Sequence, residues 1–296
     1  MTAQLAAPAI STQTWTWQGH QIHYAVQGTG QPLVLVHGFG ACIGHWRKNI
    51  PVLAAAGYRV FALDLLGFGA SDKPKLDYRL EIWQELLQDF WSAFIQEPAI
   101  FIGNSMGGLI TLMMLAHHPD ISAGGVLLNS AGGLNMNMRD DEQNVVRRIL
   151  MGGINTLIAS KRLGPSLFNR VRTKQRIRGS LSQVYRNPEA ITDELVDMIH
   201  AAAATPGAQE AFASIMTAPA GPRPSELLPS IEKPLLVLWG ENDPWAALPT
   251  ADIYRLLSEE AETQVTFKTI PNTGHCPHDE RPEVVNPLII DWLSQL

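Results

Sequence analysis

One serine lies in a sequence context that can make its hydroxyl a nucleophile. Ser105 is at the centre of the segment Gly103-Asn104-Ser105-Met106-Gly107, which follows a short apolar run and precedes an apolar helical pattern. This strand–turn–helix order is what a nucleophile elbow requires. The turn is strained and needs small residues two positions before and after the serine, which Gly103 and Gly107 supply. We predict that Ser105 is a nucleophile, the alternative being a chance match to a short and common pattern.

A serine hydroxyl needs a base within hydrogen-bond reach, and the base needs a third group to orient it. In the fold built on this elbow, the acid and then the histidine follow the serine along the chain. Asp243 lies in the segment after the apolar run Leu235–Trp239, and His275 lies in the segment after Val265–Ile270. We predict that His275 is the base and that Asp243 orients it. Trp245, which follows closely, is expected in the substrate pocket.

Both of these roles have an alternative candidate. His278 follows His275 closely and could be the base, and Glu241 could replace Asp243 as the acid. An acid after the preceding apolar run is excluded, because Asn129 and Ser130 stand there. Five other histidines read as surface or helix-end residues, namely His20, His23, His117, His118 and His200.

A second motif, His-Gly-Phe-Gly at residues 37–40, also follows an apolar run. Acyl transfer needs backbone N–H groups aimed at the oxygen that gains negative charge. We expect the amides of Phe39 and Met106 to form this oxyanion hole, with Gly38 giving the turn its backbone freedom. A purely structural tight turn is the alternative, and it is compatible with the same arrangement.

The composition limits the class of protein. The chain has 296 residues, 46% hydrophobic and 17% charged, which is enough for one large domain with or without an inserted lid. A formal net charge of −6 leaves no overall basic footprint, so we expect no nucleic-acid partner. We expect no cofactor and no metal, because the sequence has no dinucleotide or P-loop fingerprint and no ligand cluster at metal-binding spacing.

The location of the protein is also suggested by the sequence. The N-terminal residues lack the basic start and apolar run of a signal peptide, and no stretch of about 18 apolar residues occurs. The two cysteines, Cys42 and Cys276, fit a reducing compartment and read as packing residues. We expect a soluble, cytoplasmic protein that can still touch a membrane surface.

The candidate residues must be held in place by strands and helices. Short runs of Val, Leu and Ile alternate with helical patterns, which indicates strands buried on both faces of a parallel sheet. The expected strands are Ile22–Val26, Leu33–Val36, Val60–Leu63, Ala99–Ile102, Gly125–Leu128, Leu235–Trp239 and Val265–Ile270. The expected helices are Leu80–Ile95, Met106–His117, Pro249–Glu259 and Pro282–Leu293. This order predicts an α/β fold with a mostly parallel, doubly wound sheet.

The alternation stops between about residues 132 and 229, where the sequence is helical in pattern and has no convincing strand. A helical insertion between two strands of a parallel sheet is expected to cover the strand ends, where such sheets bind ligands. We therefore predict a core formed by residues 1–131 and 230–296, with a helical cap over residues 132–229.

The predicted cap is basic in a chain that is acidic elsewhere. Residues 139–186 contain eleven Lys and Arg and three Asp and Glu, a formal charge of +8. Apolar residues lie between the charges at roughly helical spacing. Basic amphipathic helices often bind anionic membrane surfaces, so our hypothesis is a cap that docks on a membrane. The alternative is a solvated lid whose apolar face packs on the core.

Taken together, the motifs resemble those of capped α/β hydrolases. They are His37-Gly-Phe-Gly, Gly-Asn-Ser105-Met-Gly-Gly, Gly-Glu-Asn-Asp243-Pro-Trp and Gly-His275-Cys-Pro-His-Asp-Glu. The resemblance extends from about Trp15 to Leu293. It is strongest to the pheophytinase-like group of photosynthetic organisms, through the longer segments Phe212–Gly221 and Gly274–Asn286.

This resemblance implies a substrate class. Pheophytinases hydrolyse the phytyl ester of pheophytin, so it implies a carboxylic-ester hydrolase for a hydrophobic long-chain ester, of the kind met in chlorophyll metabolism. Carbon–carbon bond hydrolases of ring-cleavage products share Gly-Asn-Ser-Met-Gly-Gly and are the main enzymatic alternative. A catalytically silent binding protein is the other alternative. Epoxide hydrolases and haloalkane dehalogenases have Asp where this chain has Ser105, so both activities are disfavoured.

Overall fold

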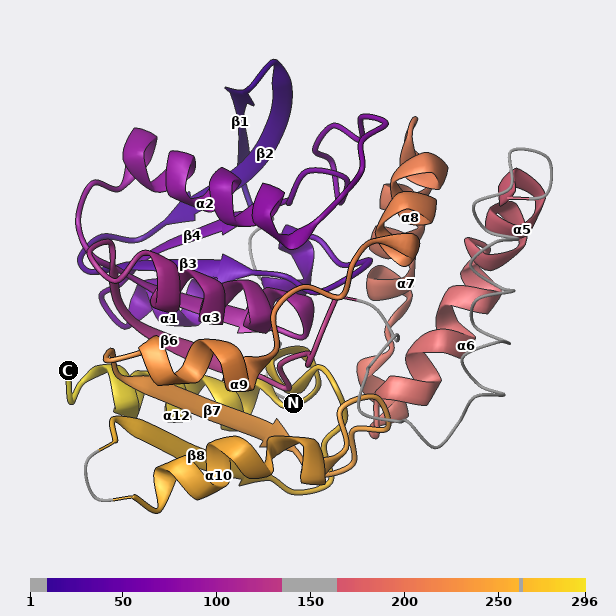
Figure 1. The fold of residues 1–296 in the computed structure, drawn as a ribbon. Helices are drawn as coiled ribbons and strands as arrows, with labels where there is room; N and C mark the ends of the chain where they lie inside the picture. Colours follow the sequence, from indigo (N-terminus) through magenta and orange to yellow (C-terminus); the bar gives the residue numbers. More distant parts are fainter. Residues whose placement is uncertain (1–9, 135–163, 261–262) are drawn as a thin grey trace.

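The computed structural model describes residues 10–134, 164–260 and 263–296, and its framework is an eight-stranded sheet (Figure 1). The strands are β1 (Thr12–Trp17), β2 (His20–Gln27), β3 (Pro32–Val36), β4 (Arg59–Leu63), β5 (Ala99–Asn104), β6 (Ser122–Leu128), β7 (Leu235–Gly240) and β8 (Val265–Ile270). Their order across the sheet is β1-β2-β4-β3-β5-β6-β7-β8. Strands β3 to β8 run parallel, whereas β2 pairs antiparallel with both β1 and β4. The mostly parallel sheet expected from the sequence is confirmed.

Helices cover both faces of this sheet. In β3, Leu33 and Leu35 belong to one hydrophobic core and Val34 and Val36 to the other, because successive side chains of a strand point to opposite faces. The first core is completed by α1 (Ile50–Ala55) and α12 (Pro282–Leu293). The second is completed by α2 (Leu80–Phe94), α3 (Met106–His117), α9 (Pro224–Leu227) and α10 (Asp252–Ser258). The doubly wound arrangement explains why the central strands read as continuous apolar runs.

A few elements differ from the expectation. Strand β1 was missed because its threonine-rich sequence is largely exposed and has no apolar run. Helix α1 was missed because its six residues are too few for a helical period to stand out. The helix expected over Pro249–Glu259 begins as a short 3-10 turn, Leu248–Ala251, and is α-helical only from Asp252.

Of the described helices between β6 and β7, four stand together beside the sheet, at the end toward which the parallel strands point (Figure 1). They are α5 (Gly164–Val171), α6 (Lys174–Val184), α7 (Asp193–Ala203) and α8 (Ala208–Thr217). We call residues 164–217 the cap segment. It has a small hydrophobic cluster of its own, which also includes Cys276 from the core. The predicted cap boundaries stay a prediction, since residues 135–163 lie outside the described residues.

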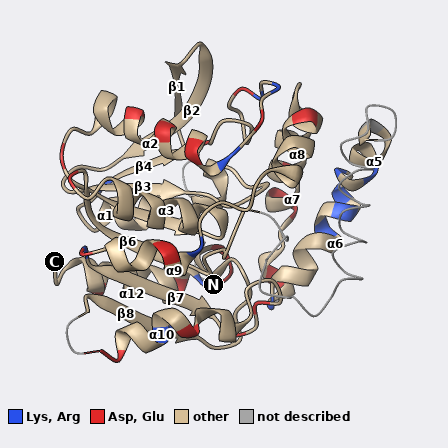
Figure 2. Cartoon of the chain, viewed as in Figure 1, with Lys and Arg blue, Asp and Glu red and all other residues tan. Residues whose placement is uncertain are grey.

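Basic residues are concentrated along α5 and α6, coloured blue in Figure 2. Residues 170–178 hold five Lys and Arg and no acid. Two of the five pair with acids of α7: Lys174 contacts Asp197 at 2.6 Å, and Arg178 contacts Asp193. Five further basic residues of the predicted patch, between residues 139 and 162, lie outside the described part of the chain. Among the helices that the structure describes, none has the length and apolar character needed to cross a bilayer.

Candidate active site

Ser105 lies in a sharp turn between β5 and α3. Its backbone has φ 55° and ψ −120°, a region that non-glycine residues rarely adopt and that marks strain at functional sites. The turn is packed so closely that a Cβ on Gly103 would lie 2.1 Å from the carbonyl oxygen of Gly107. A Cβ on Gly107 would lie 2.1 Å from the carbonyl oxygen of Val36. Both positions therefore require glycine, which is the reason the sequence predicted for them.

The loop after β3 packs against this turn. A Cβ on Gly38 would lie 3.1 Å from the Cβ of Ser105. The buried ring of His37 holds the loop: its Nδ1 lies 2.8 Å from the carbonyl oxygen of Gly38, and its Nε2 lies 3.0 Å from the N–H of Leu65. Because Nε2 accepts, Nδ1 carries the proton and donates it to Gly38. Burial lowers the pKa of His37, which keeps the ring neutral in this role.

The two residues expected to form the oxyanion hole come from segments that meet at Ser105. Met106 is the first residue of α3, where a backbone N–H has no partner within the helix and the helix dipole favours negative charge. Phe39 follows Gly38 in the packed loop, and its ring contacts Phe212 of α8 with centroids 5.6 Å apart. Their action as oxyanion donors stays a prediction.

Asp243 and His275 form a buried pair. Nδ1 of His275 lies 2.6 Å from Oδ2 of Asp243, and the two residues are 5% and 4% exposed. The other carboxylate oxygen accepts the backbone N–H groups of Trp245 and Ala246 at 2.8 and 3.0 Å. Burial opposes ionisation of Asp243, but the hydrogen bond and charge of His275 and these two amides outweigh it and hold the pKa of Asp243 below its ordinary value. An ionised Asp243 leaves Nε2 of His275 as the nitrogen that can accept a proton.

Two asparagines that the sequence did not single out connect these parts. Asn104, next to Ser105, donates from Nδ2 to the carbonyl oxygen of His275 at 2.9 Å, so the loop of the base is attached to the elbow. Asn129, at the end of β6, donates to Oδ2 of Asp243 at 2.8 Å. The sequence signal for Asn129 was only a polar residue directly after a buried strand, because the pairing of that strand with the strand before Asp243 is seen only in the structure.

The alternative candidates fit their roles poorly. The ring of His278 is fully buried against Trp46 and His45, with centroids 4.2 and 4.8 Å apart. Desolvation by burial and the neighbouring His45 lower its pKa well below the ordinary value, which makes it a poor base. Glu241 is exposed, whereas Asp243 has the contact to the imidazole.

Trp245, expected in the substrate pocket, lies beside His275, and its contact with a substrate stays a prediction. The residue is 52% exposed, and its ring is tilted against that of His275, with centroids 5.4 Å apart and an interplanar angle of 60°. A large exposed aromatic ring beside a buried base suits an apolar ligand.

The absence of a metal site, expected from the sequence, stays a prediction. Across residues 10–134, 164–260 and 263–296, no three His, Cys, Asp or Glu side chains are grouped so that they could hold a metal ion. Both cysteines are buried and free, and burial raises the pKa of Cys42 to about 12. The absence of a cofactor stays a prediction.

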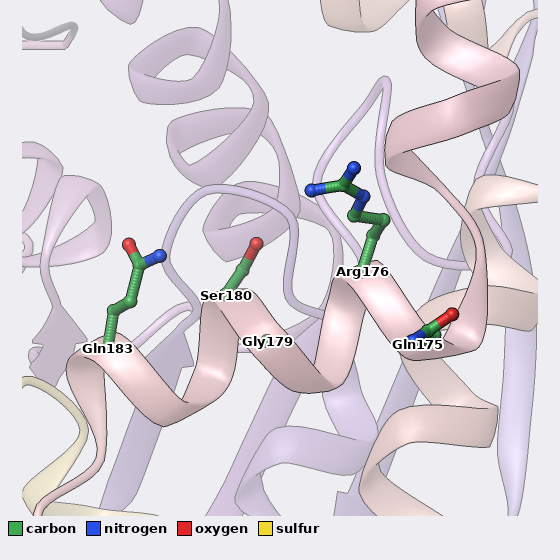
Figure 3. Close-up of a pocket in the computed structure, with 5 residues that line it drawn as sticks. All are labelled: Gln175, Arg176, Gly179, Ser180 and Gln183. Atoms are coloured by element: carbon green, nitrogen blue, oxygen red, sulfur yellow. The ribbon is translucent and has the colours of Figure 1, made fainter.

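A surface hollow of about 340 Å³ lies along α6 (Figure 3). Arg176, Ser180 and Gln183 stand on one side of the helix there, and Gln175 and Gly179 complete the lining. None of the predicted site residues lines it, so we assign it no part in the chemistry.

Comparisons with known proteins agree with this framework. The chloroplastic pheophytinase of Arabidopsis thaliana is 27% identical over 98% of this chain and 68% of its own length. The 2-hydroxy-6-oxo-6-(2'-aminophenyl)hexa-2,4-dienoic acid hydrolase of Metapseudomonas resinovorans is 40% identical over 38% of this chain and 40% of its own. Among solved structures, a serine hydrolase involved in carbazole degradation (the CarC enzyme) has a TM-score of 0.76 at 25% identity, covering 97% of this chain and all of that one.

The model of one family spans the segments that carry the candidate site. It matches residues 33–288, from β3 through the segments of Ser105, Asp243 and His275 into α12. With its sheet order and its covering helices, the chain belongs to the alpha/beta hydrolase family.

Proposed function

We propose that this protein is a serine hydrolase that cleaves carboxylic esters through an acyl-enzyme. The observation that carries the proposal is the 2.6 Å contact between His275 and Asp243, in a loop that Asn104 attaches to the strained turn of Ser105. A base that a buried carboxylate orients, in a loop attached to the segment of the nucleophile, supports this proposal.

The chemistry then proceeds in two halves. Nε2 of His275 takes the hydroxyl proton of Ser105 while Oγ of Ser105 attacks the ester carbonyl. The amides of Phe39 and Met106 stabilise the oxyanion that forms. His275 returns the proton to the alcohol that leaves. Water, activated by the same imidazole, then releases the acid from Ser105. Asp243 stays ionised throughout, which its lowered pKa favours.

The substrate we propose is a hydrophobic long-chain ester, such as the phytyl ester of pheophytin or chlorophyll. The likeness to a pheophytinase over 98% of the chain supports this class. The exposed Trp245 beside His275 also supports this class. So do the aromatic contacts of Phe212, whose ring centroid lies 5.6 Å from that of Phe39 and 5.3 Å from that of Phe168. These aromatic rings lead from the predicted oxyanion loop into the cap segment.

A second candidate is hydrolysis of a carbon–carbon bond on the same residues. It is supported by the partial relative at 40% identity, which is named a hydrolase of a hexadienoic acid, and by the likeness to the carbazole-degrading serine hydrolase. Product analysis separates this activity from ester hydrolysis.

We also propose that the cap segment contacts an anionic membrane surface, where a lipid-soluble ester would reach the site. The run of five basic residues at 170–178, from the end of α5 into α6, supports this, with the exposed Val171 among them. Charge attraction between such a run and anionic headgroups favours binding at low salt. The cytoplasmic location expected from the sequence remains a proposal.

The substrate is tested by incubating pheophytin a with wild type and with Ser105→Ala, and separating the products by chromatography. Release of phytol by wild type alone supports both the residue and the substrate class. Cleavage of short nitrophenyl esters without phytol release would support the ester activity and contradict a pigment ester as the substrate. Cleavage of a ring-cleavage dienoic acid in preference to both esters would favour the second candidate.

A further inference from the structure

A short stretch of the cap segment rests directly on the backbone of the predicted base. We call residues 184–187, at the end of α6, the strap. The N–H of His275 donates to the carbonyl oxygen of Val184 at 2.8 Å. The packing is so close that a Cβ on Gly274 would lie 2.0 Å from that same oxygen. A glycine directly before the histidine is therefore required by the strap.

The carboxylate of Glu280 joins the strap to the histidine loop. Glu280 is 4% exposed and ends the short helix α11 (Pro277–Glu280). One of its oxygens, Oε2, accepts the N–H of Gly274 at 2.8 Å. The other, Oε1, accepts the N–H groups of Arg186 and Asn187 at 2.9 and 2.7 Å. A single buried side chain thus binds three backbone donors on two segments.

A second contact holds the strap through Tyr185, the residue before Arg186. The hydroxyl of Tyr185 donates to Oδ2 of Asp279 at 2.7 Å and accepts from Nε2 of His45 at 2.8 Å. Asp279 is buried and is held in turn by Arg47 and Lys48, at 2.8 and 3.1 Å. The strap is thereby fixed to α11, the helix that carries Glu280.

The loop of His275 is therefore held from two directions. Asn104 of the elbow donates to its carbonyl oxygen, and the strap accepts its N–H. The loop lies between the segment that carries the nucleophile and the segment that belongs to the cap.

We propose that Glu280 is a positioning residue for His275, acting by tying the strap of the cap segment to the backbone of Gly274. The way in which the cap segment packs on the core then determines the orientation of His275. This inference rests on the proposed function of His275 and Ser105.

The test compares Glu280→Gln with wild type on a short nitrophenyl ester. Glutamine has the same shape, but its amide nitrogen donates, so one of the two segments loses its acceptor. We expect kcat to fall about 10- to 100-fold with little change in KM, because small displacements of a catalytic group cost this much. The rate at which a fluorophosphonate labels Ser105 should fall in parallel, since labelling needs the same activated hydroxyl.

The matched control is Glu283→Gln. Glu283 is exposed on α12 and pairs with Arg281 at 2.6 Å, so its loss should leave kcat and labelling unchanged. Thermal unfolding of each variant is measured first, and all assays are run at a temperature at which every variant is folded. If Glu280→Gln does not fold, Glu280→Asp takes its place, because it keeps the charge but is too short to bind both segments.

Two outcomes overturn the inference. If the folded Glu280 variant is only less stable and keeps the kcat and labelling rate of wild type, Glu280 has a structural role alone. If wild type itself is not labelled at Ser105, the proposed function fails and this inference fails with it. A labelled wild type with a slow Glu280 variant and a normal Glu283 variant supports the proposal.

Discussion

Asn129 donates from Nδ2 to Oδ2 of Asp243 at 2.8 Å, onto the same oxygen that lies 2.6 Å from Nδ1 of His275. Its own Oδ1 accepts the N–H of Gly240 at 2.9 Å, so the amide links the ends of β6 and β7 around the carboxylate. Asn129 holds this position with a φ of 43°, a region that asparagine tolerates better than most residues.

Replacing Asn129 with Ala should therefore affect the acid and not only the fold. The variant removes a donor to the ionised carboxylate, so the pKa of Asp243 should rise toward its ordinary value. A carboxylate with a lowered pKa stabilises the fold at neutral pH, and that stability is lost as the pH falls through the folded pKa. We expect Asn129→Ala to lose about 1–3 kcal/mol of unfolding free energy at neutral pH. The acid limb of its activity profile should move to higher pH.

The control for this change is Asn272→Ala. Asn272 is exposed and has a similar φ of 54°, so its substitution reports backbone strain alone. Urea unfolding at several pH values and the pH dependence of kcat/KM measure both variants. Equal behaviour of the two would mean that Asn129 does nothing specific for Asp243.

Buried histidines should make the fold sensitive to acid. Burial lowers the pKa of His45 to about 4 and that of His278 well below its ordinary 6.5. The unfolded chain then binds these protons more readily than the folded one, so stability is present above the ordinary pKa and is lost as the pH falls from about 6.5 toward 4. His278→Phe keeps a ring against Trp46 and removes one of the two titrations.

We expect His278→Phe to be close to wild type in stability at pH 7.5, because neither ring nitrogen has a hydrogen-bond partner among the described residues. Its unfolding free energy should fall less steeply with acid than that of wild type. Urea titrations across this pH range measure the slope. An unchanged slope would contradict the burial of a neutral His278.

The glycine on the helix side of the elbow should tolerate no side chain. Gly107→Ala places a Cβ 2.1 Å from a backbone oxygen, and overpacking of this kind typically costs about 1–3 kcal/mol. Gly179→Ala on α6 is the control, since nothing lies within 4 Å of the added Cβ and helix propensity alone should stabilise it by about 0.5–1 kcal/mol. Thermal unfolding of the two variants should shift in opposite directions. A change in unfolding temperature of the same sign and size in both variants would contradict a steric requirement for glycine at position 107.

The framework of the site could be predicted from sequence, because its parts are local. The apolar run, the glycines and the serine of the elbow lie within a few residues of one another, and Asp243 and His275 each follow a buried strand. Asn129 and Glu280 could not be identified in this way. Their roles come from contacts to segments far along the chain, and no local period or spacing reports which strand ends become neighbours in the sheet.

The basic cap is testable apart from the chemistry. Arg170 and Arg176 are exposed on α5 and α6, and changing both to Glu should weaken binding to anionic vesicles, at about 1 kcal/mol for each basic residue removed from the surface. The double variant Lys75→Glu/Lys268→Glu has the same change in net charge on exposed residues of the core and is the control. Co-sedimentation with phosphatidylserine and with phosphatidylcholine vesicles, at low and high salt, measures the binding. Absence of wild-type binding at every salt concentration would remove the membrane proposal.

The most direct test of the central claim is whether Ser105 is an activated nucleophile. Wild type and Ser105→Ala are treated with a fluorophosphonate, and the intact mass and the modified peptide are determined. We predict that wild type gains one phosphonyl group, located on Ser105, and that folded Ser105→Ala gains none. A folded wild type that stays unlabelled, or a Ser105→Ala variant labelled to the same extent, would contradict the claim.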